Sequence, residues 1–205
     1  IVFSGRHLNA IYVVDPASGE VVWRYAEDLD WQHEAMVVPD GLPGAGNVFV
    51  FNNRFHSDDR QSAVLELDPS DGRVLWTYRD PGFFTDAGGV QQVLPNDDVL
   101  ITSSRGGRVF EVNRAGEIVW QYTPPYPPMR VNRYAWDHCP QLTAIDRQPE
   151  EPVTREASTP FVDQSLHRFA LSKEEVRVKL GGKKRGIFPP DAPCAEIAVP
   201  TSPAL

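Results

Sequence analysis

The sequence has no long hydrophobic run, since its most apolar stretches, such as 48–51, extend for only a few residues. A helix that crosses a bilayer needs about 20 apolar residues, so none is predicted. Basic residues are also few: 20 Lys and Arg against 28 Asp and Glu give a net charge of −8, which repels nucleic-acid phosphates. We therefore expect no nucleic-acid partner. The chain opens on Ile1 without a charged, apolar leader, and we expect any targeting segment to have been removed.

Cysteine is scarce, with only Cys139 and Cys194, which lie 55 residues apart. A disulfide between them would stabilise the fold by roughly 3–4 kcal/mol and would suit a periplasmic or otherwise extracytoplasmic location. Two reduced, buried thiols are the alternative. No pair of residues has metal-ligand spacing, so the sequence predicts neither a metal nor a cofactor.

Proline is abundant and unevenly placed. Six of the 19 prolines precede Trp120, and 13 lie in the 83 residues after Tyr122. Proline cannot donate to a strand ladder, so the sequence predicts two regions: a β-rich region at 1–142 and a mostly irregular, proline-rich extension at 143–205. The extension cannot bury a core of its own, and we expect it to wrap the first region or to reach another subunit.

One pattern of strands occurs three times. The segment 19–25 recurs at 72–78 and 116–122, at spacings of 53 and 44 residues, each time with a central tryptophan. Two apolar segments precede each copy, and a third precedes them in the last two units only. In chain order these segments are 2–6 and 10–15, then 35–40, 48–54 and 63–68, then 90–96, 99–105 and 108–113. Four short strands per unit predict blades of a β-propeller.

The predicted fold class is therefore all-β, with about three propeller blades of four antiparallel strands. A closed ring needs at least about four blades, so we expect a fragment, or half of a ring completed by a second copy or another protein. Trp23, Trp76 and Trp120 are expected to fill the wedges between blades as core residues rather than to bind ligands.

Two local sequences do not follow from the repeat. These are Ser-Gly-Arg-His at 4–7 and Gln-His-Glu-Ala at 32–35, followed by Pro-Asp-Gly at 39–41 and Phe-Asn-Asn at 51–53. In this order they resemble the bacterial arylsulfate sulfotransferases, six-bladed propellers with the motifs Ser-Ser-Arg-His, Gln-His-Asp/Thr-Ala and Phe-Asp-Asn-Gly. The third unit agrees, because 89–98 and Leu-Ile-Thr at 100–102 match that family's Gly-x-Gln-x-Leu-Pro-Asn-Gly-Asn and Leu-Ile-Thr. The resemblance covers about residues 1–142.

The resemblance implies a catalytic site. In that family the histidine of the Gln-His motif takes the sulfuryl group of an aryl sulfate and passes it to a phenol, without an adenylyl-sulfate donor. His33 is its counterpart, Arg6 is the implied sulfate-binding residue, and His7 lies beside it. A neutral imidazole is a good nucleophile near pH 7, and an arginine fork suits a sulfate.

Alternatives remain at several positions. Arg54 and Arg105 occupy similar places in the later units, so Arg6 can equally be structural, and His56 and His138 are interpreted as structural. Glu34 replaces the family's Asp or Thr, and either orients the imidazole or repels sulfate. Further family site residues, including a His-x-Asn motif, belong to blades upstream of Ile1. The alternative function is thus a non-catalytic propeller, a structural or interaction subunit of a larger extracytoplasmic complex.

Overall fold

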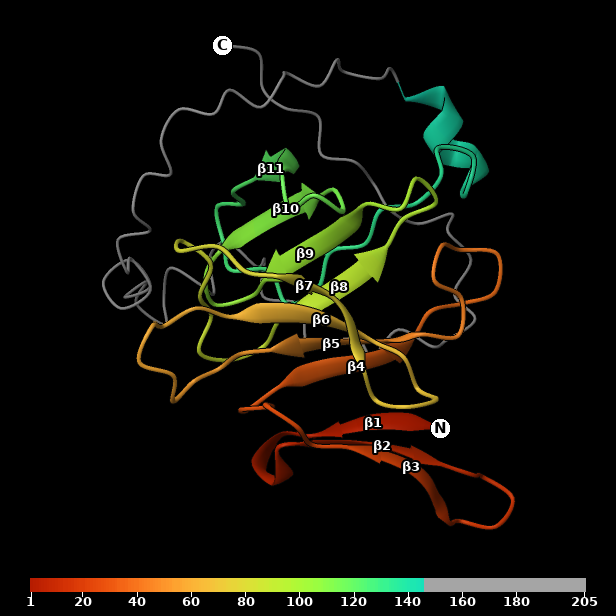
Figure 1. The fold of residues 1–205 in the computed structure, drawn as a ribbon. Coiled ribbons are helices and arrows are strands. Elements are labelled where there is room, and N and C mark those ends of the chain that lie inside the picture. The colour runs from red at the N-terminus through yellow and green to blue at the C-terminus, as the bar shows by residue number, and fades with distance from the viewer. Residues whose placement is uncertain (146–205) are drawn as a thin grey trace, which may run out of the picture. The chain divides into compact units, whose positions relative to one another are not determined.

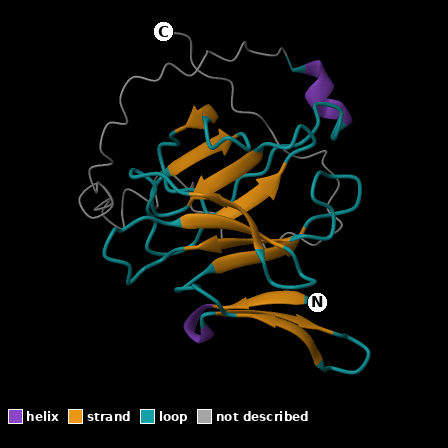
Figure 2. Cartoon of the chain, in the orientation of Figure 1, coloured by secondary structure: helices purple, strands orange, loops and turns teal. Residues whose placement is uncertain are grey.

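The computed structural model describes residues 1–145, which contain eleven strands and two short 3-10 helices (Figures 1 and 2). Residues 1–133 belong to one compact unit and residues 134–145 to a second. The predicted extension beyond residue 145, including Cys194 and its pairing with Cys139, lies outside the described residues. No helix of the described part is long and apolar enough to cross a membrane.

The strands of the first unit form three antiparallel sheets that follow one another along the chain (Figure 1). The first sheet has three strands: β1 (Val2–Gly5), β2 (Ala10–Val14) and β3 (Val21–Tyr25). The second has β4 (His33–Val37), β5 (Val48–Asn52), β6 (Ala63–Leu67) and β7 (Val74–Tyr78). The third has β8 (Val90–Val93), β9 (Val99–Ser103), β10 (Arg108–Val112) and β11 (Ile118–Tyr122). Each sheet is a meander of consecutive strands, as in a propeller blade.

The predicted strands are confirmed, including the missing fourth strand of the first unit. Several predicted segments extend two or three residues beyond the strand ends, which lie at Val37, Asn52, Val93 and Ser103. One start also differs, because β4 begins at His33 rather than at Ala35. The cause is a β-bulge: His33 pairs with Phe51 and Ala35 with Val50, which leaves Glu34 unpaired with a φ of 42°. A bulge redirects the side chains beside it, and here it lies within the Gln-His motif.

The core lies between neighbouring sheets, which is why the central strands are buried on both faces. In β5, Phe49 and Phe51 pack in a cluster with Ile101 and Phe110 of the third sheet. Side chains alternate along a strand, so Val48 and Val50 of β5 face the other way. They pack in a cluster with residues of the first sheet. One strand thereby joins three blades.

The three repeated tryptophans pack against this core, in agreement with the sequence interpretation. Trp23, Trp76 and Trp120 are each partly buried against a different hydrophobic cluster. Trp76 also donates its indole N–H to the backbone oxygen of Arg114 in the third sheet, at 3.0 Å. A buried indole usually finds such a partner, and this one connects two blades.

The hairpins that lead into the first two tryptophan strands, β3 and β7, share one turn. Asp15 accepts the backbone N–H of Ala17, and Asp68 accepts that of Ser70, both at 2.9 Å. These are Asx-type turns, and Gly19 and Gly72 end them at φ values of 74° and 76°. The hydrogen bond from Ala17 lowers the pKa of Asp15, and the bond from the Ser70 hydroxyl does the same for Asp68. The Asp in each of these two hairpins thus has a defined structural role.

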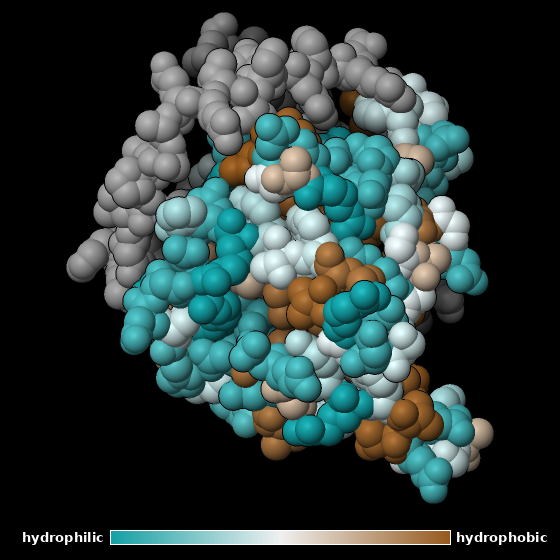
Figure 3. Space-filling model, in the orientation of Figure 1, coloured by the Kyte–Doolittle hydropathy of each residue, from teal (hydrophilic) through white to brown (hydrophobic). Residues whose placement is uncertain are grey.

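The described surface in Figure 3 is mostly hydrophilic, with hydrophobic side chains in small separate groups. Among the exposed apolar residues, several lie on the outer strands β3, β7 and β11: Val21, Val22, Val74, Leu75 and Val119. Scattered exposed apolar side chains are normal for folded proteins.

The second unit, as far as it is described, contains a 3-10 helix at Pro140–Ala144. His138, interpreted as structural from the sequence, stacks on Tyr134 with ring centroids 4.5 Å apart. The thiol of Cys139 lies 3.0 Å from the side-chain oxygen of Gln141.

An ion-pair cluster joins the second and third sheets, and Arg114 is its centre. The guanidinium lies 2.6 Å from Glu66, whose side chain is 7% exposed, and 2.6 Å from Asp97. Removing the cation would leave the Glu66 carboxylate buried without its charge partner, a change that costs about 3–5 kcal/mol in a fully buried pair.

We therefore expect Arg114→Met to lower the free energy of unfolding by about 2–3 kcal/mol, less than that range because Arg114 is 26% exposed. Urea denaturation measures the change. Arg73→Met removes an arginine whose nearest acidic partner, Asp68, lies 3.7 Å away and whose side chain is 66% exposed. This control should change stability by under about 0.5 kcal/mol; equal losses in the two variants would contradict the role given to Arg114.

Candidate functional site

The two unusual motifs lie at the same end of adjacent blades. Gly5 at the end of β1 pairs with Ala10, just as Asn52 at the end of β5 pairs with Ala63. The next residue in each blade is therefore Arg6 in the first and Asn53 in the second. His33 begins β4, which runs antiparallel to β5, so the start of β4 lies beside the end of β5. Arg6, Asn53 and His33 thus lie at the same end of the strands in these two blades.

This register corrects the repeat equivalence drawn from the sequence. In the third blade Ser103 pairs with Arg108, so the position equivalent to Arg6 is Ser104, not Arg105. Arg54 and Arg105 follow one residue later and form ion pairs, Arg54 with Asp59 at 3.1 Å and Arg105 with Asp86 at 3.3 Å. Arg6 forms no ion pair within residues 1–145, so its charge is not compensated there as theirs is.

Gln32 connects the two motifs directly. Its side chain is fully buried, and its amide nitrogen donates to the Ser4 hydroxyl at 3.0 Å and to the backbone oxygens of Gly5 and Ala10 at 3.2 and 3.0 Å. The residue immediately before His33 is therefore fastened to the turn that contains Arg6. The Gln of the Gln-His motif has a structural role, which is to hold the two blades in register.

His33 is held at both ring nitrogens. Nδ1 lies 2.7 Å from Oδ1 of Asn53, and the backbone N–H of Gly88 points to Nε2 at 3.3 Å. The ring is half-buried at the start of β4. An imidazole with two fixed partners has a defined orientation, which a nucleophile or a proton-transfer group requires.

Glu34 faces a different partner. Its carboxylate lies 2.6 Å from the guanidinium of Arg130, and its backbone oxygen accepts the side-chain amide of Gln91 at 2.8 Å. Within the described residues it makes no hydrogen bond to His33. Glu34 therefore does not orient the imidazole, which Asn53 contacts instead. The negative charge of Glu34, which could repel a sulfate, is paired with Arg130.

Arg6 and His7 gather around Trp31. The guanidinium of Arg6 lies 3.7 Å from the centre of the Trp31 ring, a cation–π distance, and His7 meets the same ring edge-on at 5.5 Å. Arg6 Nη1 is 3.3 Å from Nε2 of His7. Phe55 stacks on Trp31 at 4.3 Å. The structure thus brings Arg6 and His7 together, against a ring two residues before His33, and within residues 1–145 neither hydrogen-bonds to His33.

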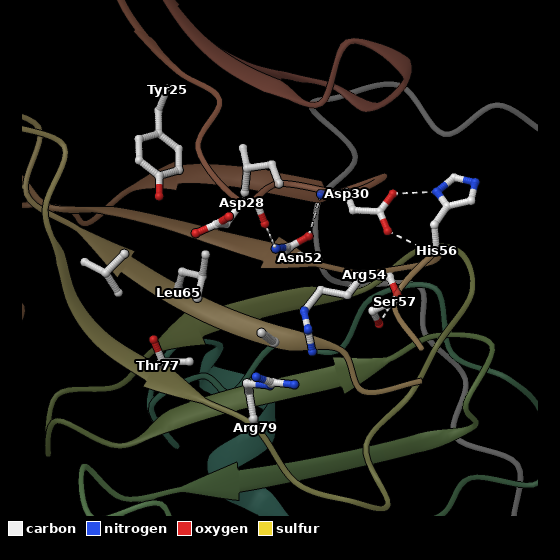
Figure 4. A pocket seen from close by; sticks show the side chains of 13 residues that line it. Tyr25, Asp28, Asp30, Asn52, Arg54, His56, Ser57, Leu65, Thr77 and Arg79 are labelled. Atoms are coloured by element: carbon white, nitrogen blue, oxygen red, sulfur yellow. Dashed lines mark hydrogen bonds and ion pairs between the residues drawn. The ribbon is translucent and has the colours of Figure 1, made fainter. Parts of the chain in front are cut away.

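A separate cleft of about 610 Å³ opens between the first and second blades (Figure 4). Its lining does not include His33, Arg6 or His7, the three site residues implied by the resemblance. The lining residues are Tyr25, Asp28, Leu29, Asp30, Asn52, Arg54, His56, Ser57, Ala63, Leu65, Val74, Thr77 and Arg79. His56, interpreted as structural, is bound by Asp30 through its ring at 2.7 Å and its backbone N–H at 2.6 Å.

Two arginines of this cleft share one carboxylate. Figure 4 shows Arg54 and Arg79 pointing into the same part of the cleft, and both pair with Asp59. Partial desolvation would raise the pKa of Asp59, but hydrogen bonds from Arg54 and Ser57 outweigh it and lower the pKa to about 2. A lowered pKa in the folded state means that ionised Asp59 stabilises the fold above about pH 4. That stabilisation is lost as the pH falls toward 2.

We expect the Asp59 carboxyl carbon to titrate near pH 2 in a ¹³C NMR titration, and Arg54→Gln to move its pKa upward toward the ordinary value near 3.9. Arg73→Gln changes an arginine that contacts other aspartates, Asp68 and Asp71, and should leave the titration in place. A titration of Asp59 near pH 4 in the unsubstituted protein would contradict the ion-pair geometry.

Sequence reasoning named His33, Arg6 and His7 as candidate site residues but missed the partners of His33. Asn53 belongs to the Phe-Asn-Asn motif, and Gly88 immediately precedes the matched segment 89–98. The sequence assigned no role to either residue. The sequence signal was the pair Asn52–Asn53 directly after the apolar run 48–51, since amides that follow a buried strand are nearly always hydrogen-bonded when they are buried.

The sheets and their register define the class of this protein as a β-propeller. The sequence model for arylsulfotransferases (ASST) matches residues 1–124, and the chain belongs to that family. No curated protein matches it.

Among solved structures, the chain is similar to virginiamycin B lyase from Staphylococcus aureus, with 12% identity and a TM-score of 0.43. It is also similar to the WD40 β-propeller domain of Doa1, with 17% identity and a TM-score of 0.41. Each match covers 62% of this chain, but only 38% and 42% of the two structures respectively.

Proposed function

We propose that this chain carries the nucleophile of an arylsulfotransferase site. The sulfur of an aryl sulfate is attacked by His33, the phenolate leaves, and an acceptor phenol then takes the sulfuryl group from the histidine. Arg6, with His7 beside it, binds the sulfate oxygens. The chemistry needs no cofactor, because the donor is itself an activated ester.

The observation that carries this proposal is the placement of His33. The chain belongs to the arylsulfotransferase family. Its histidine at the motif position of the nucleophile has a ring orientation fixed by Asn53 and Gly88. Arg6 lies at the same end of the strands, with no acidic partner among the described residues. An uncompensated guanidinium favours binding of an anion with several oxygens, and fixed positive charge also stabilises the charge that spreads over those oxygens in the transition state.

The test is a transfer assay on the natural full-length protein. With 4-nitrophenyl sulfate as donor and phenol as acceptor, we expect release of 4-nitrophenolate together with formation of phenyl sulfate, with no adenylyl sulfate added. Omitting phenol should slow turnover, since the acceptor discharges the enzyme. An intact protein that transfers no sulfuryl group from several aryl sulfates would refute the proposal and favour the non-catalytic propeller.

The proposal includes a location outside the cytoplasm, in the periplasm or an equivalent compartment. Cell fractionation of the natural host tests this part separately. Recovery with cytoplasmic markers would overturn it without affecting the transfer chemistry.

A further inference from the structure

The side-chain amide of Asn53 has only one possible orientation. Asn53 is fully buried, and its Nδ2 lies 2.9 Å from the backbone oxygen of Thr85 and 2.8 Å from that of Gly88. Carbonyl oxygens only accept hydrogen bonds, so the atom between them must be the NH₂ donor. Rotating the amide by 180° would set its oxygen against two carbonyl oxygens. The other end of the amide, Oδ1, is therefore an acceptor.

This orientation fixes the tautomer of the neutral His33 ring. Oδ1 of Asn53 can only accept, so Nδ1 of His33, 2.7 Å away, must carry the proton. On the other side of the ring, the Gly88 N–H can only donate, so Nε2 must offer its lone pair. Two partners from different segments thus require the same tautomer, with the proton on Nδ1 and the lone pair on Nε2.

We propose that Asn53 is a positioning residue that keeps the lone pair of His33 on Nε2, and that Nε2 is the atom that accepts the sulfuryl group. This inference rests on the function proposed above. In the first step the Nε2–S bond forms and the S–O bond to the aryl group breaks, and the phenolate leaves with the electron pair. The proton stays on Nδ1 throughout, hydrogen-bonded to Asn53, whose oxygen stabilises the positive charge of the sulfated ring.

In the second step the acceptor phenol attacks the sulfur, the Nε2–S bond breaks, and its electron pair returns to Nε2. The phenolic proton is released to solvent or to a phenolate. The Gly88 N–H, at 3.3 Å, makes a long and therefore weak bond to Nε2. The lone pair of Nε2 becomes available to the sulfur only when this contact opens, so the first step includes the loss of the Gly88 hydrogen bond.

The test reads the tautomer without using activity. Long-range ¹H–¹⁵N NMR on histidine-labelled, otherwise unchanged protein is expected to show His33 as the Nδ1–H form at a pH where the ring is neutral. In water the Nε2–H form of a neutral histidine predominates. The ¹⁵N chemical shifts of the His33 ring in Asn53→Leu and Asn53→Ser should therefore move toward the values of that form. The kcat of both variants for aryl sulfate transfer should fall by about 10- to 100-fold, the range found when groups that orient metal-binding histidines are removed.

The outcomes are separable. Nε2–H in the unchanged protein overturns the inference, whatever the variants do. A sulfuryl group trapped on Nδ1 also overturns it. Nδ1–H in the unchanged protein with a shift in the variants supports the role of Asn53. If that pattern accompanies an absence of transfer activity, the proposed function fails while the positioning of the ring by Asn53 stands.

Discussion

Replacing His33 by alanine is expected to lower the rate of aryl sulfate transfer by about 10³-fold or more, because the covalent route is lost and only binding and electrostatic contributions remain. The free energy of unfolding should also fall by about 1–3 kcal/mol, because the buried Oδ1 of Asn53 loses its hydrogen-bond partner. Initial rates of 4-nitrophenolate release, followed with and without phenol, measure the effect.

His56→Asn is the matched control for this prediction. It also removes a histidine, one whose side chain is 60% exposed and whose ring pairs with Asp30, and it should retain nearly all transfer activity. If His33→Ala keeps the activity of the unchanged protein, another residue is the nucleophile, and the assignment of His33 from the Gln-His motif is wrong.

Gly89→Ala is expected to destabilise the fold by about 3 kcal/mol. A Cβ atom at this position would lie 2.4 Å from the ring of Phe51, which is fully buried and meets Phe83 edge-on at 5.4 Å. Overpacking a rigid core costs about 1–3 kcal/mol. The φ of 113° adds strain of about 1 kcal/mol or more for a residue with a side chain. Urea denaturation gives the difference.

Gly41→Ala separates the two causes. Gly41 also has a positive φ, 85°, but a Cβ there would meet no atom within 4 Å. Its loss should be about 1 kcal/mol, from backbone strain alone. Equal losses at the two glycines would show that the Phe51 contact is unimportant. Because Gly89 follows Gly88, Gly89→Ala should also disturb the Gly88 N–H that points to His33.

The repeat allowed most of the fold to be predicted from the sequence. Short apolar strand segments that end in an Asp or Asn turn have local causes, so β2, β6 and β10 could be placed to within one residue of their ends. The start of β4 could not, because it depends on a bulge at Glu34. A glutamate with positive φ is uncommon, and no local pattern indicates it.

The site was predictable only in part. His33 and Arg6 lie in short motifs, so a resemblance could name them as candidates. The partners of His33 depend on contacts between segments 20 and 55 residues apart in sequence, which arise from the packing of blades against each other. The equivalence of Arg6 with Asn53 and Ser104 also required the ladder register, since alignment of the arginines shifts it by one residue.

Trapping of the sulfated enzyme tests the central claim most directly. The natural protein is mixed with 4-nitrophenyl sulfate without acceptor, quenched at high pH, where an N-sulfated histidine is expected to survive, and digested for mass spectrometry. We predict the added mass of one SO₃ on the peptide that contains His33, lost when phenol is added before the quench. A protein that turns over aryl sulfate while this group appears on another residue, or on none, would contradict the account.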